Sequence, residues 1–155
     1  SYIDVVKHVG SDVPFFINKQ PATISGIGEN VVNLNDTQPI KIIIAVPKKG
    51  LSTKEIFEKY DEMKPKNTKK YSWNDISLFN DLWNTSVEIY PELNTIKQNL
   101  EERYNKNFFM SGSGSALFSL FEENEEIEEI DSKEFNLKYF SITKKIDCSF
   151  SQNDD

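Results

Sequence analysis

Cysteine and histidine are almost absent from this 155-residue sequence, which contains only Cys148 and His8. A single cysteine excludes an internal disulfide and fits a reducing compartment. One cysteine and one histidine also leave too few ligands for a typical zinc site. No apolar run approaches the ~18 residues that a membrane-spanning helix requires. These absences argue against a disulfide-rich secreted domain, a zinc protein and a membrane-spanning protein.

Positive charge is also in short supply. The 18 lysines and arginines are outnumbered by 25 aspartates and glutamates, which gives a net charge of −7. Non-specific binding to nucleic acid or to an anionic membrane requires a basic surface, so neither is expected as a partner. Hydrophobic residues make up 37% of the chain and include 11 phenylalanines. That is enough for one sizeable globular core.

The hydrophobic pattern predicts an α+β fold. A continuous β-branched run predicts a strand over Ile40–Val46, buried on both faces. Ser52 is a good N-cap with Glu55 at capping-box spacing, which predicts a helix there. Other strands are predicted at 22–24, 31–34, on both sides of residues 111–115 and at 139–146, a polar loop at 61–70, and helices at 76–89 and 92–104. Because strands and helices cluster separately, we expect an antiparallel sheet with helices packed on one face.

Five small residues lie between two apolar stretches in "NFFMSGSGSALFSLF", Asn107 to Phe121. They are Ser111, Gly112, Ser113, Gly114 and Ser115. Glycines permit positive φ angles and let backbone N–H groups approach an anion closely, and serine hydroxyls add donors. A flexible hairpin loop is the alternative, although five small residues exceed what a turn needs.

Several stretches, taken in order, resemble the 4-diphosphocytidyl-2-C-methyl-D-erythritol kinase family. This family belongs to the superfamily of galactokinase, homoserine kinase, mevalonate kinase and phosphomevalonate kinase. The stretches are "GSDVPFFI" (10–17), "ATISGIGE" (22–29), "STKEIF" (52–57), "FNDLW" (79–83) and "MSGSGSALFSLF" (110–121). The resemblance implies an ATP- and Mg²⁺-dependent transfer to the 2-hydroxyl of the cytidyl substrate, in non-mevalonate isoprenoid biosynthesis. It also implies a location in bacterial cytoplasm or plastids.

In that family the loop that binds the ATP phosphates precedes the "GSDVPFF" segment. The resemblance therefore implies that this chain is the C-terminal part of a two-lobed kinase. Residues 1–35 would be a remnant of the preceding domain, 36–147 the C-terminal lobe and 148–155 a tail. The N-terminal lobe of the same enzyme would be its partner, and the chain alone is expected to be inactive.

By resemblance, Asp12 is the general base that accepts the proton of the substrate hydroxyl. In isolation, an aspartate in Gly-Ser-Asp is more often a turn or cap residue. The Ser111–Ser115 segment would bind the substrate's diphosphate or the oxygens beside the transferred phosphoryl group.

Thr53 and Phe57 are one helical turn apart. Phe57 would stack on the cytosine, with Thr53 beside that pocket, although Phe57 could equally be a core residue. For Asn80 and Asp81 we expect a structural role, either a hydrogen bond to the serine-glycine loop or a helix cap. The rival functions are a non-catalytic α+β binding module and a kinase of the same superfamily with another small substrate.

Overall fold

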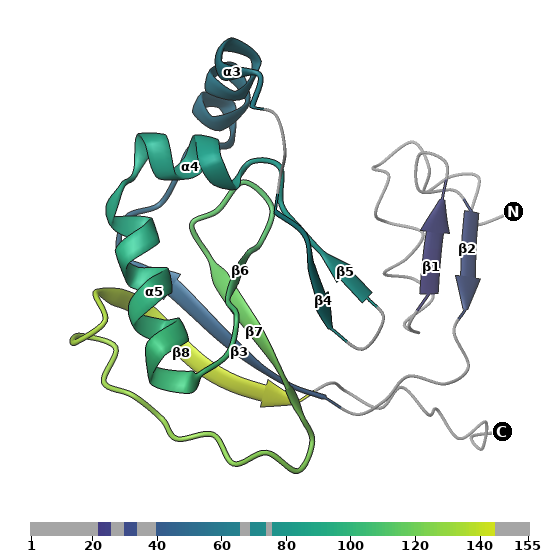
Figure 1. Ribbon diagram of the computed structural model, residues 1–155, viewed down its shortest axis with the longest axis vertical. Coiled ribbons are helices and arrows are strands. Elements are labelled where there is room, and N and C mark those ends of the chain that lie inside the picture. Colours follow the sequence, from purple (N-terminus) through teal and green to yellow (C-terminus); the bar gives the residue numbers. More distant parts are fainter. Residues whose placement is uncertain (1–21, 26–29, 34–39, 66–68, 74–75, 145–155) are drawn as a thin grey trace, which may run out of the picture. The chain divides into compact units, whose positions relative to one another are not determined.

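The computed structural model describes residues 22–25, 30–33, 40–65, 69–73 and 76–144 (Figure 1). The chain divides into two units, residues 1–39 with 146–155, and residues 40–145. The described part of the first unit is an antiparallel hairpin of β1 (Ala22–Ser25) and β2 (Asn30–Asn33), which confirms the two predicted strands. The predicted domain boundaries at residues 36 and 147 stay predictions. Within the described residues, no helix is long and apolar enough to cross a membrane.

A four-stranded antiparallel sheet forms the centre of the second unit. Its strands are β3 (Ile40–Pro47), β6 (Phe109–Met110), β7 (Leu117–Glu122) and β8 (Leu137–Lys144), in the order β6-β7-β3-β8. The central strand β3 pairs with β7 on one side and with β8 on the other, both antiparallel. The predicted antiparallel α+β sheet is therefore confirmed.

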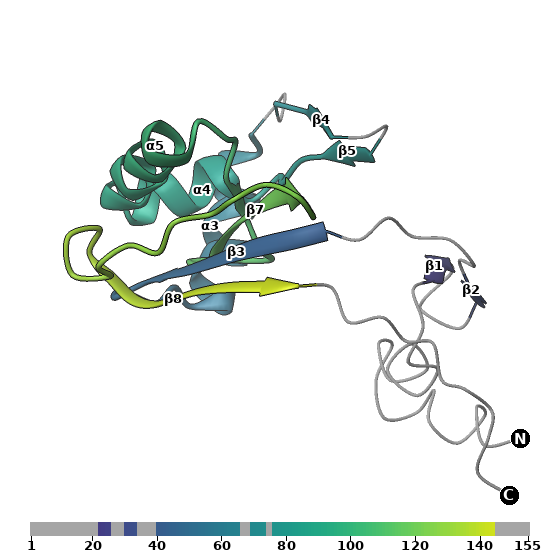
Figure 2. The same ribbon diagram turned by 90° about the horizontal axis from the view of Figure 1, so that it is seen from below.

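The helices α4 (Trp83–Ile89) and α5 (Glu92–Tyr104) cover one face of this sheet (Figure 2). On β3, Ile43 and Ala45 are fully buried, whereas the alternating residues Ile42 and Ile44 are only partly buried. The prediction that β3 is buried on both faces was wrong. Side chains of a strand alternate between faces, and only the face under the helices is fully covered.

Two predicted helices form where their local signals place them. Helix α3 (Thr53–Met63) begins after Ser52, whose Oγ accepts a hydrogen bond from the Glu55 N–H at 3.4 Å, which confirms the predicted N-cap. Helix α5 buries Leu93, Ile96 and Leu100, which recur at helical spacing, as predicted. These residues belong to a core that also contains Ile43, Ala45, Tyr90, Phe108, Met110, Leu117, Phe121 and Leu137.

The predicted helix over residues 76–89 was wrong in its first half. Strands β4 (Tyr71–Trp73) and β5 (Ile76–Leu78) form an antiparallel hairpin instead, in which Ser72 pairs with Ser77. Both strands read apolar-serine-apolar, a period of two that favours extended structure. Helix α4 begins only at Trp83, after Asn80 accepts a hydrogen bond from the Leu82 N–H and so ends the extended segment.

Six glutamates occupy residues 122–129: Glu122 ends β7, and the other five lie in the loop that follows it. Two exposed or half-exposed ion pairs attach it to the end of α5. Arg103 Nη2 lies 2.5 Å from Glu128 Oε2, and Lys106 Nζ lies 2.7 Å from Glu125 Oε1. Surface pairs of this kind contribute little to stability. Ile127 and Ile130 of the same segment pack against the core.

Candidate functional site

The serine-glycine loop, Ser111–Ser115, connects β6 to β7. The Ser111 N–H donates to the Ala116 carbonyl at 2.9 Å, and the Gly114 N–H donates to the Ser111 carbonyl at 3.0 Å. Gly112 has φ +55° and Gly114 has φ +89°, so both glycines use the left-handed region, as the sequence predicted. Neither the Gly112 N–H nor the Ser113 N–H donates a hydrogen bond to another described residue. Both N–H groups are therefore candidate donors to a ligand.

Asn80 supports this loop from the connection between β5 and α4. Its Nδ2 donates to the carbonyls of Met110 and Gly112, each at 2.8 Å. Its Oδ1 accepts from the Leu82 N–H at 2.9 Å, which links the loop to the start of α4. The predicted hydrogen bond from Asn80 to the loop is thus confirmed. The alternative, a helix cap, is not what the structure shows, because the N-cap residue of α4 is Leu82 and no side chain caps that helix.

The first turn of α3 contacts the same loop. Thr53 Oγ1 lies 2.9 Å from Ser113 Oγ, in a hydrogen bond between residues 60 positions apart. The buried Ser115 donates from its Oγ to the Lys49 carbonyl at 2.6 Å, in the connection between β3 and α3. The loop and α3 therefore lie at the same end of the sheet (Figure 1). The structure thus brings together the start of α3 and the serine-glycine loop, which the family resemblance predicts to bind the same substrate.

Phe57 follows Thr53 by one turn on α3, and its ring is 52% exposed. The alternative that Phe57 is a core residue was wrong, because the core position of this helix is occupied by Ile56, which is fully buried. An exposed aromatic ring on the helix that contacts the loop is free to pack against a ligand. Its stacking on cytosine stays a prediction.

Asp12, the predicted general base, lies outside the described residues, and so do Gly10 and Pro14 on either side of it. Within the described part of the chain, no three histidine, cysteine, aspartate or glutamate side chains lie close enough to bind one metal ion. Among the described residues, the candidate site therefore includes neither the predicted base nor a cluster suited to a metal ion.

Ser86 is a loop contact that sequence reasoning missed. It is fully buried in α4, and its Oγ lies 3.5 Å from the Ser113 carbonyl. A serine inside a helix is a weak signal, since such residues commonly face solvent or bind their own backbone. Only the position of α4 beside the loop shows what Ser86 contacts.

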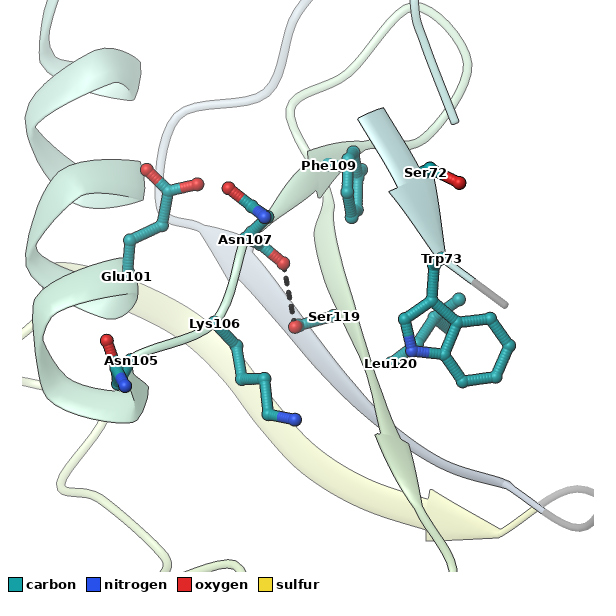
Figure 3. Close-up of a pocket in the computed structure, with 9 residues that line it drawn as sticks. All are labelled: Ser72, Trp73, Glu101, Asn105, Lys106, Asn107, Phe109, Ser119 and Leu120. Carbon is teal, nitrogen blue, oxygen red and sulfur yellow. Dashed lines mark hydrogen bonds between the residues drawn. The ribbon is translucent and has the colours of Figure 1, made fainter. Parts of the chain in front are cut away.

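A cavity of about 360 Å³ lies away from the loop, between β4 and the end of α5 (Figure 3). None of the predicted site residues lines it. Two of its polar groups already have partners: Ser119 Oγ donates to the Asn107 carbonyl at 2.8 Å, and the Glu101 carboxylate accepts from the Phe108 N–H at 2.9 Å. The loop is the stronger candidate site because it contacts Thr53, another of the predicted site residues.

Comparison with known proteins identifies a domain in this chain. Residues 69–133 match the family described as GHMP kinases C terminal. The 4-diphosphocytidyl-2-C-methyl-D-erythritol kinase of Protochlamydia amoebophila is 38% identical over 114 residues, covering 72% of this chain and 40% of that protein. The enzyme of the same name from Clostridioides difficile is 34% identical over 148 residues, covering 87% of this chain and 50% of that protein.

A solved structure has the same fold. A crystal structure of 4-(cytidine 5'-diphospho)-2C-methyl-D-erythritol kinase aligns with a TM-score of 0.57 at 21% identity, covering 77% of this chain and 47% of that chain. This chain thus spans about half the length of the curated relatives that it matches. The match to a C-terminal family domain agrees with the predicted C-terminal part of a two-lobed kinase.

Proposed function

Because this chain carries a C-terminal domain of the GHMP kinase family, we propose that it is the C-terminal half of an ATP-dependent kinase. The proposed reaction is phosphorylation of the 2-hydroxyl of 4-diphosphocytidyl-2-C-methyl-D-erythritol, in non-mevalonate isoprenoid biosynthesis. Its curated relatives carry the name of that activity. They come from bacteria, which favours the bacterial cytoplasm over the plastid as the proposed location.

The hydrogen bond between Thr53 and Ser113 is the structural observation that carries this proposal. It joins the helix proposed to bind the nucleoside to the loop proposed to bind the phosphates. A nucleoside diphosphate ester needs both elements within reach of one another. An aromatic ring such as Phe57 stacks on a base, while backbone N–H groups on a glycine-rich loop donate hydrogen bonds to the phosphate oxygens.

Within this proposal, the Gly112 and Ser113 N–H groups and the Ser111 and Ser113 hydroxyls bind the diphosphate or the oxygens beside the transferred phosphoryl group. Asn80 keeps the loop in its shape by binding the carbonyls that flank Ser111. Such positioning provides most of the catalysis in phosphoryl transfer. No step of the transfer itself is assigned to the described residues.

Asp12 is proposed as the general base, which orients the hydroxyl and accepts its proton as the new bond to phosphorus forms. Mg²⁺ would neutralise charge on the ATP phosphates. The described residues contain no cluster suited to this ion, so we assign no metal ligand among them. The ATP phosphate loop is likewise proposed to lie in the other lobe of the enzyme.

The test is coupled ADP release by the complete protein that contains this chain. The substrates compared are the cytidyl diphosphate methylerythritol, galactose, homoserine and mevalonate. The proposal expects turnover only with the cytidyl substrate. Turnover with one of the other three would mean that the protein is a kinase with a different substrate. No turnover with any of the four would favour a non-catalytic binding module.

A further inference from the structure

A second cavity, of about 240 Å³, is lined by Met110, the residue that directly precedes the serine-glycine loop. Its lining residues come from β4 and the residues before it, from the connection between β5 and α4, from the helices α4 and α5, and from β6 with the residue before it. Five of its ten lining residues are aromatic, and the others are two lysines, two asparagines and one methionine. They include Lys69, Tyr71, Phe79, Asn80, Phe109 and Met110.

Two neighbouring lysines lie over aromatic rings that line this cavity. Lys69 Nζ lies 4.7 Å from the centre of the Tyr71 ring, and Lys70 Nζ lies 5.0 Å from the centre of the Phe79 ring. Phe79 is 51% exposed. Among the described residues, no carboxylate lies within ion-pair distance of Lys69 or Lys70. Together, these two lysines place positive charge beside the cavity on a chain whose net charge is −7.

We propose that this cavity binds a small aromatic anion. The aromatic ring of the ligand would pack against Tyr71, Phe79 and Phe109. Tyr71 and Phe109 already form an edge-to-face pair, with ring centroids 5.4 Å apart and planes at 81°, and a ligand ring would extend this arrangement. The carboxylate or phosphate of the ligand would pair with Lys69. A cavity of this size accepts one ring with a short acidic chain and is too small for a drug-sized molecule.

Two of the lining residues also support the serine-glycine loop. Asn80 binds the carbonyls of Met110 and Gly112. The Met110 sulfur packs so closely on Gly114 that a methyl group added to that glycine would lie 2.7 Å from it. A ligand in the cavity would touch both side chains, so binding should be sensed at the loop. The consequence for substrate binding rests on the proposed function of the loop, whereas the ligand site itself does not.

Methionine methyl NMR on the complete protein provides a direct test. This chain has two methionines: Met110 lines the cavity, and Met63 lies at the end of α3. The probe is 3-phenylpropanoate, with neutral 3-phenylpropanamide as the matched control. We expect the acid to shift the Met110 methyl signal saturably and to leave Met63 unchanged. We expect the amide to bind roughly tenfold more weakly, as loss of one charge-assisted contact implies.

Lys69→Ala should weaken binding of the acid roughly tenfold and leave binding of the amide unchanged. The matched control is Lys138→Ala, which removes another exposed lysine, from β8, at the edge of the sheet opposite β6. It should leave both affinities unchanged. No saturable Met110 shift with the acid, equal affinity for acid and amide, or an equal effect of the two substitutions would each overturn the proposal.

The backbone N–H signals of Gly112 and Gly114 report the connection to the loop. They should shift with the same dissociation constant as the Met110 methyl. If the Met110 methyl signal shifts with the acid while the Gly112 and Gly114 signals do not, the connection between the cavity and the loop is wrong. None of these readouts requires turnover, so failure of the proposed kinase activity and failure of this binding site are distinguishable.

Discussion

Replacement of Gly114 by alanine is expected to strain the serine-glycine loop more than replacement of any other described glycine. Gly114 has φ +89°, a region that costs a non-glycine residue about 1–2 kcal/mol. Its new methyl group would lie 2.7 Å from Met110 Sδ and 3.0 Å from Leu51 Cδ1. Forcing extra volume into a packed region costs about 1–3 kcal/mol. We therefore expect the free energy of unfolding to fall by about 2–5 kcal/mol.

Two other glycines provide matched controls. Gly112 has φ +55° but nothing within 4 Å of an added methyl group, so Gly112→Ala should cost only the conformational term of about 1–2 kcal/mol. Gly50 has open space and no positive φ, so Gly50→Ala should be neutral or stabilising by up to ~1 kcal/mol. Urea unfolding followed by far-UV circular dichroism measures all three differences, provided that the m-value is unchanged.

A double substitution separates the contact from the backbone strain. Met110→Ala removes the sulfur, so the combined loss of Gly114→Ala and Met110→Ala should be smaller than the sum of the single losses by about 1 kcal/mol. If Gly114→Ala costs no more than Gly112→Ala and the double substitution is additive, the close packing of Met110 on this loop is incorrect.

The remaining predictions concern the complete enzyme. Asp12→Asn should lower kcat by roughly 10²–10⁴ with little change in KM, and retention of more than about a tenth of kcat would make Asp12 a turn residue. Thr53→Val should raise KM for the cytidyl substrate by about 2–10-fold by removing the bond to Ser113, whereas Thr53→Ser should restore it. Phe57→Ala should raise KM about 5–100-fold, the range for a lost base stack, with stability unchanged because the ring is exposed. Met63→Ala, on the same helix and also exposed, should leave KM unchanged. The 155-residue chain alone should release no ADP, and measurable turnover by it would mean that it contains a complete nucleotide site.

Local signals in the sequence predicted the elements whose stability depends on nearby residues. The β-branched run of β3 and the spacing of Leu93, Ile96 and Leu100 in α5 each identify their element. Ser52 identifies the start of α3 because its side chain binds a backbone N–H three residues away. These interactions involve close neighbours along the chain, so the sequence carries them directly.

The errors occurred where distant contacts decide the structure. Residues 76–78 are too few for their period of two to identify a strand, and they form one because they pair with 71–73, whose Tyr71 packs on Phe109. The one-sided burial of β3 depends on which face α4 and α5 cover. No local period contains this information.

The candidate site shows the same division. The glycines of the loop predicted its positive φ angles, and the family resemblance selected Thr53, Phe57 and the loop. The hydrogen bond between Thr53 and Ser113 spans 60 residues, and the bonds from Asn80 span about 30. Such contacts emerge only from the fold. The position of Asp12 relative to the loop lies outside the described residues, and its role as the base stays a prediction.

The most direct test of the central claim is the identity of the product that the complete protein makes from ATP and 4-diphosphocytidyl-2-C-methyl-D-erythritol. Phosphorus NMR should show one new phosphomonoester signal beside an intact diphosphate, coupled to the methyl-bearing carbon that carries the 2-hydroxyl. A phosphomonoester on another carbon, or no new ester while ATP remains unconsumed, would contradict the proposal that this chain is half of a kinase for that hydroxyl.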